Sequence, residues 1–134
     1  MVRDSCFVRR RILKSLEVGK RLEGQLSESS SQQPIRDYKD LHVWQKGMQL
    51  AKGIYLLTSR FPSAEKFGLV SQMCRAAVSI PSNIAEGQAR NTTGEFIQFI
   101  SHAEGSAAEI DTQLRLGIEL GYCTANDPDT FFGC

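Results

Sequence analysis

Between residues 41 and 60, apolar residues recur at alternating steps of three and four, the spacing of one side of an α-helix. They form two neighbouring stripes: Leu41, Trp44, Met48, Ala51 and Tyr55 in the first, and Val43, Gly47, Leu50, Ile54 and Leu57 in the second. A face of this width needs more than one neighbour to cover it, which predicts burial inside a helical bundle and leaves room for contact with another subunit. Asp40 is expected to cap the start of this helix, and Pro62 to end it, because the residue before a proline avoids the α region.

A second helix with the same spacing is predicted over residues 64 to 87. Its apolar face contains Val70, Met73, Ala77, Ile80 and Ile84, and is widened by Phe67, Cys74, Val78 and Ala85. Cys74 is interpreted as a small core residue, because its neighbours are apolar and no histidine is near it in the sequence. Pro81 removes one helical hydrogen bond and predicts a kink after Ala77. Gly87 is expected to end the helix in the left-handed conformation.

A third helix is predicted from residue 92 to residue 120. Thr92 and Glu95 have the spacing of a capping box, in which each residue satisfies a free group of the other at the start of a helix. The apolar positions that follow are Phe96, Ile100, Ala103, Ala107, Ile110 and Leu114. Gly121 is expected to end the helix. Small residues fill its middle, and Gly105 is predicted to mark a close crossing with a facing helix.

Residues 27–36 are rich in serine and glutamine and poor in apolar groups, which predicts a linker. The linker separates a basic N-terminal arm, residues 1–36, from a folded domain, residues 37–134. The arm has eight Lys+Arg against four Asp+Glu, a net charge of +4, whereas the domain has eight against eleven, a net charge of −3. The candidate nucleic-acid or partner-binding residues of the arm are Arg9, Arg10, Arg11, Lys14, Lys20 and Arg21. The arm is expected to be disordered or partly helical, and the alternative to a binding role is a disordered extension or upstream sequence that lies before the true start of the domain.

The composition of the 134-residue chain restricts its class further. It leaves no room for a second full domain, and no apolar run approaches the ~20 residues that a membrane-spanning helix needs. The four cysteines form no CxxC pair, so neither a zinc framework nor a disulfide scaffold is predicted. We expect a soluble cytoplasmic protein with no cofactor, no metal, no small-molecule substrate and no contact with a membrane.

Several short segments together resemble one known family. They are Tyr38-Lys39-Asp40-Leu41 with Val43-Trp44, the run from Arg75 to Pro81, the run from Asn83 to Gly87, Arg90, Glu95-Phe96, Phe99, Gly105-Ser106 and Glu109. This pattern resembles the 23S rRNA-intervening-sequence protein family of small bacterial four-helix-bundle proteins, over about residues 37 to 131. The run from Ser79 to Gly87 is its most specific part.

The resemblance implies an all-α fold, an antiparallel four-helix bundle that assembles into a ring-shaped homo-oligomer, a pentamer by family analogy. It also implies a link to genes inserted in ribosomal RNA operons, and similar proteins act as accessory nucleic-acid-binding partners of a reverse transcriptase. The chain departs from the family in its basic arm and in its fourth helix. That helix could begin at Thr124 or Asp127, with Pro128 in its first turn, but only six residues follow Pro128, so we expect it to be truncated.

The candidate chemistry is sparse, and we expect no enzyme. The polar residues carried by the family motifs are Asn83, Glu86, Arg90, Glu95 and Glu109. They are interpreted either as a structural network that holds the loop before residue 92 or as a patch that binds a partner, with Arg90 contacting a phosphate or a carboxylate. What the resemblance implies, together with the sparse chemistry, favours an oligomeric accessory protein for RNA or a ribosome-related partner. Two alternatives stay open: a purely structural homo-oligomer, and a ribonuclease that uses Arg36 and His42.

Overall fold

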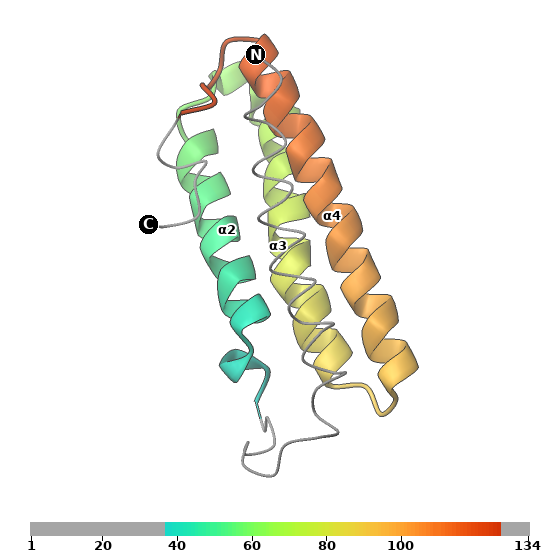
Figure 1. Cartoon of the computed structure of the whole chain (residues 1–134). Coiled ribbons are helices and arrows are strands. Elements are labelled where there is room, and N and C mark those ends of the chain that lie inside the picture. Colours follow the sequence, from blue (N-terminus) through green and yellow to red (C-terminus); the bar gives the residue numbers. More distant parts are fainter. Residues whose placement is uncertain (1–36, 127–134) are drawn as a thin grey trace.

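The structure, a computed structural model, describes residues 37–126. This part of the chain contains the α-helices α2 (His42–Thr58), α3 (Leu69–Gln88) and α4 (Thr93–Glu119), with the 3-10 helices η1 (Tyr38–Asp40) and η2 (Ser63–Glu65). Each α-helix runs antiparallel to the one before it (Figure 1). The described residues contain no strand, which confirms the all-α fold. The four-helix bundle is not confirmed, because residues 37–126 contain three α-helices. Residues 124–126, where the predicted fourth helix could begin, are not helical, and its other residues lie outside the described range.

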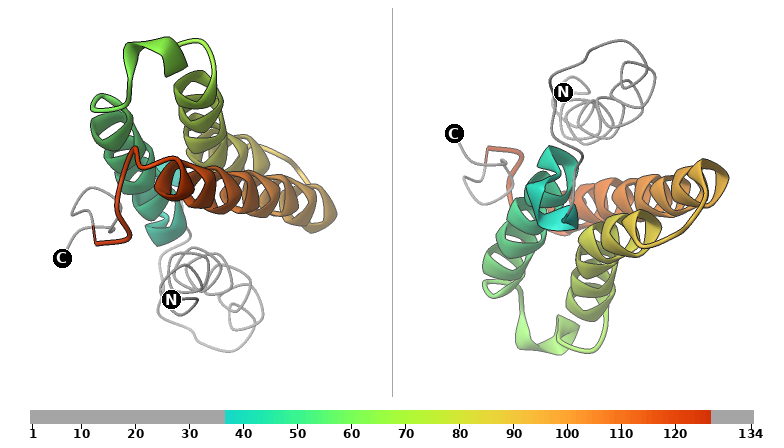
Figure 2. Two further views of the ribbon diagram at one scale, coloured as in Figure 1. Left: turned by 90° about the horizontal axis from the view of Figure 1, so that it is seen from above. Right: turned by 90° about the horizontal axis from the view of Figure 1, so that it is seen from below.

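Views along the helices place α2, α3 and α4 at the corners of a triangle (Figure 2). Helix α3 packs against both of the others, and α4 lies beside it. The fully buried side chains that fill the centre are Ile54, Leu57, Met73, Ile80, Ile84 and Ile110. Burial of each such side chain contributes about 1.5 to 3 kcal/mol, so this shared core holds the three helices together.

The two apolar stripes of α2 have different surroundings. The second stripe is buried throughout, as predicted. The first stripe is covered only in part: Ala51 is buried and Leu41 and Trp44 pack against the core, whereas Met48 is 46% exposed and Tyr55 is 53% exposed. The prediction of burial was also wrong for Phe67 and Val78, which are 90% and 43% exposed. The physical reason is that α2 packs against α3 on the side of the second stripe, and no other helix of the described chain covers Met48 and Tyr55.

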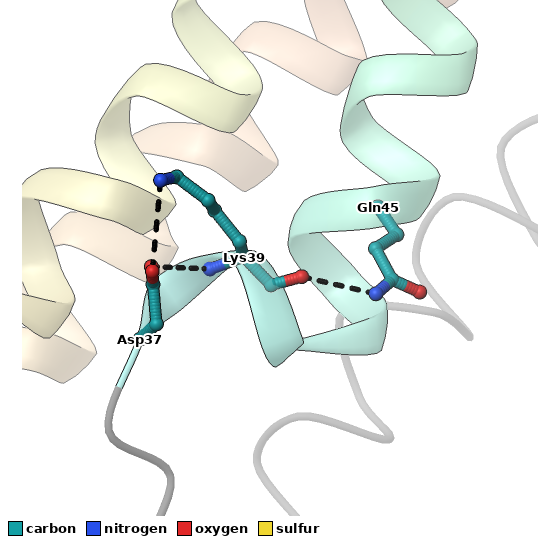
Figure 3. Close-up of polar contacts among 3 residues, drawn as sticks. All are labelled: Asp37, Lys39 and Gln45. Carbon is teal, nitrogen blue, oxygen red and sulfur yellow. Dashed lines mark hydrogen bonds and ion pairs between the residues drawn. The ribbon is translucent and has the colours of Figure 1, made fainter.

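The start of α2 differs from the prediction. Asp40 belongs to η1, and Leu41 is the residue that precedes α2, with no side-chain cap. Asp37 Oδ1 accepts a hydrogen bond from the Lys39 backbone N–H at 3.0 Å, and Lys39 Nζ lies 3.6 Å from Asp37 Oδ2 (Figure 3). The Gln45 side-chain amide then donates to the Lys39 carbonyl at 3.0 Å, which ties η1 to the first turn of α2.

The start of α4 follows the prediction. Thr92 precedes the helix, and its Oγ1 accepts a hydrogen bond from the Glu95 backbone N–H at 3.2 Å. The same hydroxyl donates to Glu95 Oε2 at 2.7 Å. The predicted capping box is confirmed, since threonine and glutamate hold each other at the helix start.

The glycines of α3 and α4 differ in backbone conformation and in how closely another helix approaches them, and the sequence did not predict these differences correctly. Gly87 is helical and does not end α3 in the left-handed region; Gly121, with φ +77°, is the glycine that follows α4 in that conformation. A Cβ on Gly87 would lie 2.8 Å from Phe99 Cβ, whereas a Cβ on Gly105 would meet nothing within 4 Å. The close approach of α3 and α4 is therefore at Gly87, and the crossing predicted at Gly105 was wrong.

Pro81 lies within α3, which is assigned as one helix from Leu69 to Gln88. The proline is buried, and a Cβ on Gly47 of α2 would lie 3.4 Å from Pro81 N and 3.3 Å from Ile80 Cγ2. Glycine at position 47 therefore lets α2 approach α3 at the proline. The kink after Ala77 stays a prediction.

Candidate partner-binding surface

A groove of about 740 Å³ lies between the exposed sides of α2 and α3. Its lining residues are Tyr55, Lys66, Phe67, Val70, Ser71, Cys74, Arg75, Val78 and Ser79. Most of this set is apolar or aromatic, and its charged members are the cations Lys66 and Arg75. No carboxylate lines the groove, so its local charge has the opposite sign to the net charge of residues 37–134.

Side-chain contacts fix the helices that form the groove relative to one another and to α4. The Thr58 hydroxyl donates to the Ile54 carbonyl at 2.8 Å and lies 3.6 Å from Cys74 Sγ. Cys74 is half-buried and lines the groove, so its interpretation as a core residue is correct only in part: it contacts α2 but lies outside the buried core. The Ser79 hydroxyl contacts the Ser106 hydroxyl of α4 at 2.5 Å, so the same wall of the groove is also fixed to α4.

The polar residues of the family motifs are not brought together into one network. The Asn83 side-chain amide donates to the Ser79 carbonyl at 2.7 Å within α3, and Glu95 is occupied in the capping box. The Arg90 guanidinium carbon lies 4.8 Å from the centre of the Phe99 ring. Within residues 37–126 no ion pair joins Arg90 to a carboxylate. Glu86 and Glu109 are exposed on α3 and α4.

The Arg90–Phe99 contact shows how the loop between α3 and α4 is held. A guanidinium over an aromatic ring gains about 0.5 to 1 kcal/mol at an exposed site. Together with the capping box it fixes the loop without a carboxylate partner for Arg90. Arg90 is exposed, so its guanidinium edge is free to contact a phosphate or a carboxylate, which leaves the binding interpretation as a prediction.

The other predicted residues lie at the edge of the described structure or beyond it. His42 is the first residue of α2 and is exposed. Arg36 and the basic residues of the arm lie outside residues 37–126: Arg9, Arg10, Arg11, Lys14, Lys20 and Arg21. Within the described range, no three His, Cys, Asp or Glu side chains are grouped so as to hold a metal ion.

Sequence reasoning missed a contact between η2 and the segment after α4. The Tyr122 hydroxyl donates to Glu65 Oε1 at 3.1 Å, while Glu65 Oε2 accepts from the Leu69 backbone N–H at 3.0 Å. Glu65 thus caps the start of α3 and holds the segment after α4. Gly68 leaves room for this carboxylate, because a Cβ there would lie 2.8 Å from Glu65 Oε2. The Phe61 ring, 5.4 Å from that of Tyr122, packs beside the contact.

Because of this contact, we expect the domain to lose stability as the pH rises through the alkaline range. The hydrogen bond to Glu65, desolvation and the negative charge of Glu65 raise the pKa of Tyr122 above its ordinary value of 10.0. Because the folded pKa is the higher one, the stabilisation is complete below pH 10.0 and is lost as pH rises through the folded pKa.

We expect Tyr122→Phe to lower the urea midpoint near neutral pH and to lose less stability than the natural chain above pH 10.0. Tyr55→Phe is the matched control, because Tyr55 is 53% exposed and its hydroxyl makes no hydrogen bond to the described residues. Urea unfolding from neutral to alkaline pH measures both. If the urea midpoint of Tyr122→Phe and that of the natural chain change with pH in parallel, a role for the ionisation of the Tyr122 hydroxyl is contradicted.

Comparison with known protein families matches residues 39–132 to the family described as 23S rRNA-intervening sequence protein. The chain belongs to this family. The match covers α2, α3 and α4 together with Tyr122. No curated protein matches the chain.

In this 23S rRNA-intervening sequence protein, the matched region and the basic arm are separate parts of the chain. The match begins at Lys39, in η1, after the positively charged residues 1–36. None of the helices within residues 37–126 is both long enough and apolar enough to cross a membrane. The candidate binding features are the groove between α2 and α3 and the exposed apolar residues Met48 and Tyr55 of α2, and outside residues 37–126 the basic arm stays a prediction from sequence.

Proposed function

We propose that this 23S rRNA-intervening sequence protein is a non-enzymatic, self-associating accessory protein that binds RNA or a ribosome-related partner in the cytoplasm. The observation that carries the proposal is the family match over residues 39–132, which contains the helices, next to a separate basic arm. The helices provide a rigid unit that assembles, and the arm provides the positive charge. Family resemblance favours a ring, with five copies as the number to test.

The arm suits the phosphate backbone of RNA for a simple electrostatic reason. Residues 1–36 have a net charge of +4, whereas residues 37–134 have a net charge of −3 and repel a polyanion as a whole. Arginine and lysine side chains that neutralise phosphates release counterions, so affinity falls as salt rises. Assembly multiplies the effect, because several arms of one oligomer contact one RNA at a high effective concentration.

The test compares two double substitutions that remove the same charge. We expect Arg10→Gln with Arg11→Gln to lower the log-log salt slope of single-stranded RNA binding by about 1.4, at about 0.7 for each phosphate contact. Lys46→Gln with Lys52→Gln is the matched control, since both lysines are exposed on α2. Fluorescence anisotropy over a range of salt concentrations gives the slopes.

Each of the other results has a defined meaning. Equal slopes for the two variants would contradict the arm as the binding element. The absence of RNA binding by the full chain at low salt would favour the purely structural homo-oligomer. The RNA recovered from the assay is also examined for cleavage, and cleavage that His42→Ala abolishes would favour the ribonuclease alternative with Arg36 and His42.

A further inference from the structure

We infer that the groove between α2 and α3 is a binding site for single-stranded RNA, in which bases stack on Phe67 and Tyr55 while Lys66 and Arg75 contact phosphates. The inference rests on the proposed function and adds a second binding element to the arm. The arm contributes positive charge, which attracts the phosphates of any nucleic acid, single-stranded or double-stranded. The groove adds aromatic surfaces that only unpaired bases can reach.

Phe67 is the observation that starts the argument. It lies in the turn between η2 and α3 and is 90% exposed, so its ring contributes almost nothing to the core. Tyr55 lines the same groove from α2 and is 53% exposed. Exposed aromatic rings beside positive charge are the combination on which single-stranded nucleic acids stack, because every base has a flat π surface.

The cations of the groove are placed to accompany such stacking. Lys66 Nζ lies 5.6 Å from the centre of the Phe67 ring, so a charge and a stacking surface are adjacent. Arg75 is exposed, and within residues 37–126 it has no ion pair with a carboxylate. The nearest acidic residue in sequence, Glu65, is occupied by Tyr122 and the Leu69 N–H. A phosphate in the groove therefore meets positive charge without a competing carboxylate on its walls.

A second copy of the same groove is a poorer occupant. Two copies related by a twofold axis place the same surface on both sides of the contact. Lys66 and Arg75 of one copy would then face Lys66 and Arg75 of the other, and like charges in a desolvated contact are unfavourable. An acidic peptide would satisfy the charges but has no need of two exposed aromatic rings. Single-stranded RNA satisfies both the rings and the charges.

The experiment uses the full chain, a fluorescent oligouridylate and an RNA duplex of the same charge. We expect Phe67→Ala to weaken oligouridylate binding by about fivefold to 150-fold, the loss of one stacked base, with an unchanged salt slope and unchanged duplex affinity. Leu116→Ala is the matched control, because Leu116 is 46% exposed on α4, outside the groove. At 90% exposure, Phe67 can be replaced without opening a cavity.

A second variant tests the charged half of the site. Arg75→Gln is expected to lower the salt slope for oligouridylate by about 0.7, one phosphate contact. Natural affinity in both groove variants would overturn the inference. Equal losses for oligouridylate and duplex in Phe67→Ala would also overturn it, as would a fall in oligomer mass by light scattering, which would make the groove a subunit interface.

Failure of the groove and failure of the proposed function are distinguishable. If the groove variants bind normally while Arg10→Gln with Arg11→Gln lowers the slope, the arm binds RNA and the groove does not. If the full chain binds neither RNA, the proposed function and the inference both fail. Binding of polyglutamate that is tighter than that of oligouridylate and that Arg75→Gln weakens would assign the groove to an acidic peptide and overturn the inference.

Discussion

Gly87→Ala is expected to be less stable than Gly105→Ala by about 1 to 3 kcal/mol, the usual cost of overpacking a tight contact. Gly105 is in the interior of α4, where alanine gains about 1 kcal/mol of helix propensity, whereas Gly87 is one residue before the end of α3, where the gain is smaller, so propensity shifts the comparison in the same direction as the steric effect. The remaining difference is steric. At Gly87 the added Cβ would lie 2.8 Å from Phe99 Cβ and 3.0 Å from Phe96 Cδ2, and at Gly105 it would meet nothing within 4 Å.

The clash at Gly87 has no easy relief. Phe99 Cβ is attached directly to the backbone of α4, so it moves only if α4 moves relative to α3. That movement disturbs Ile84 and Ile100, which are buried at this end of the core. Thermal unfolding at equal protein concentration measures the effect, and about 4 to 8 °C of midpoint is expected for each kcal/mol in a domain of this size. Equal midpoints for the two variants would show that the helices separate without cost.

These two glycines also show where sequence reasoning stops. Both lie in helical patterns, and small neighbours made Gly105 the better candidate for a crossing. Which glycine faces another helix depends on the rotation of α3 and α4 about their axes, and local spacing does not fix that rotation. The same limit applies to α2: its spacing gave two apolar stripes but not the choice of the one that α3 and α4 would cover.

Some local features were predicted well because their causes are local, although Asp40 does not cap α2 and Gly87 does not end α3. The capping box of Thr92 and Glu95 spans three residues, and the three helices follow from repeated spacing, although α3 begins at Leu69 and not near residue 64. The Tyr122–Glu65 hydrogen bond joins residues 57 apart, and neither residue has a neighbouring pattern that indicates the other. The groove between α2 and α3 likewise joins residues from two helices. Sequence alone showed Phe67 as one more member of an apolar face, and its exposure became visible only once the turn after η2 was placed.

The exposed residues of the first apolar stripe of α2 lead to a second prediction with a large effect, which concerns assembly. We expect light scattering to give the natural chain a mass that is a multiple of 14.9 kDa, and Met48→Glu to reduce it to that of a single chain. Met48 is 46% exposed, and the half-buried Leu41 and Trp44 precede it in the same stripe. Apolar side chains gathered on an exposed surface mark an interaction site, and burial of a carboxylate there without a partner is costly.

The control for Met48→Glu is Gln49→Glu, which adds the same charge one residue further along α2. Gln49 is exposed and outside the stripe, so this variant should keep the natural mass. Trp44, the single tryptophan of the chain, lies one turn before Met48 and reports dissociation by its fluorescence. Tyr55 belongs to both the stripe and the groove, two turns or about 10 Å after Met48, but the groove variants change Phe67 and Arg75, which lie before and on α3 and outside the stripe, so the two surfaces can be tested with different variants. A single-chain mass for the natural protein at micromolar concentration would contradict self-association, and an unchanged mass for Met48→Glu would move the interface away from this stripe.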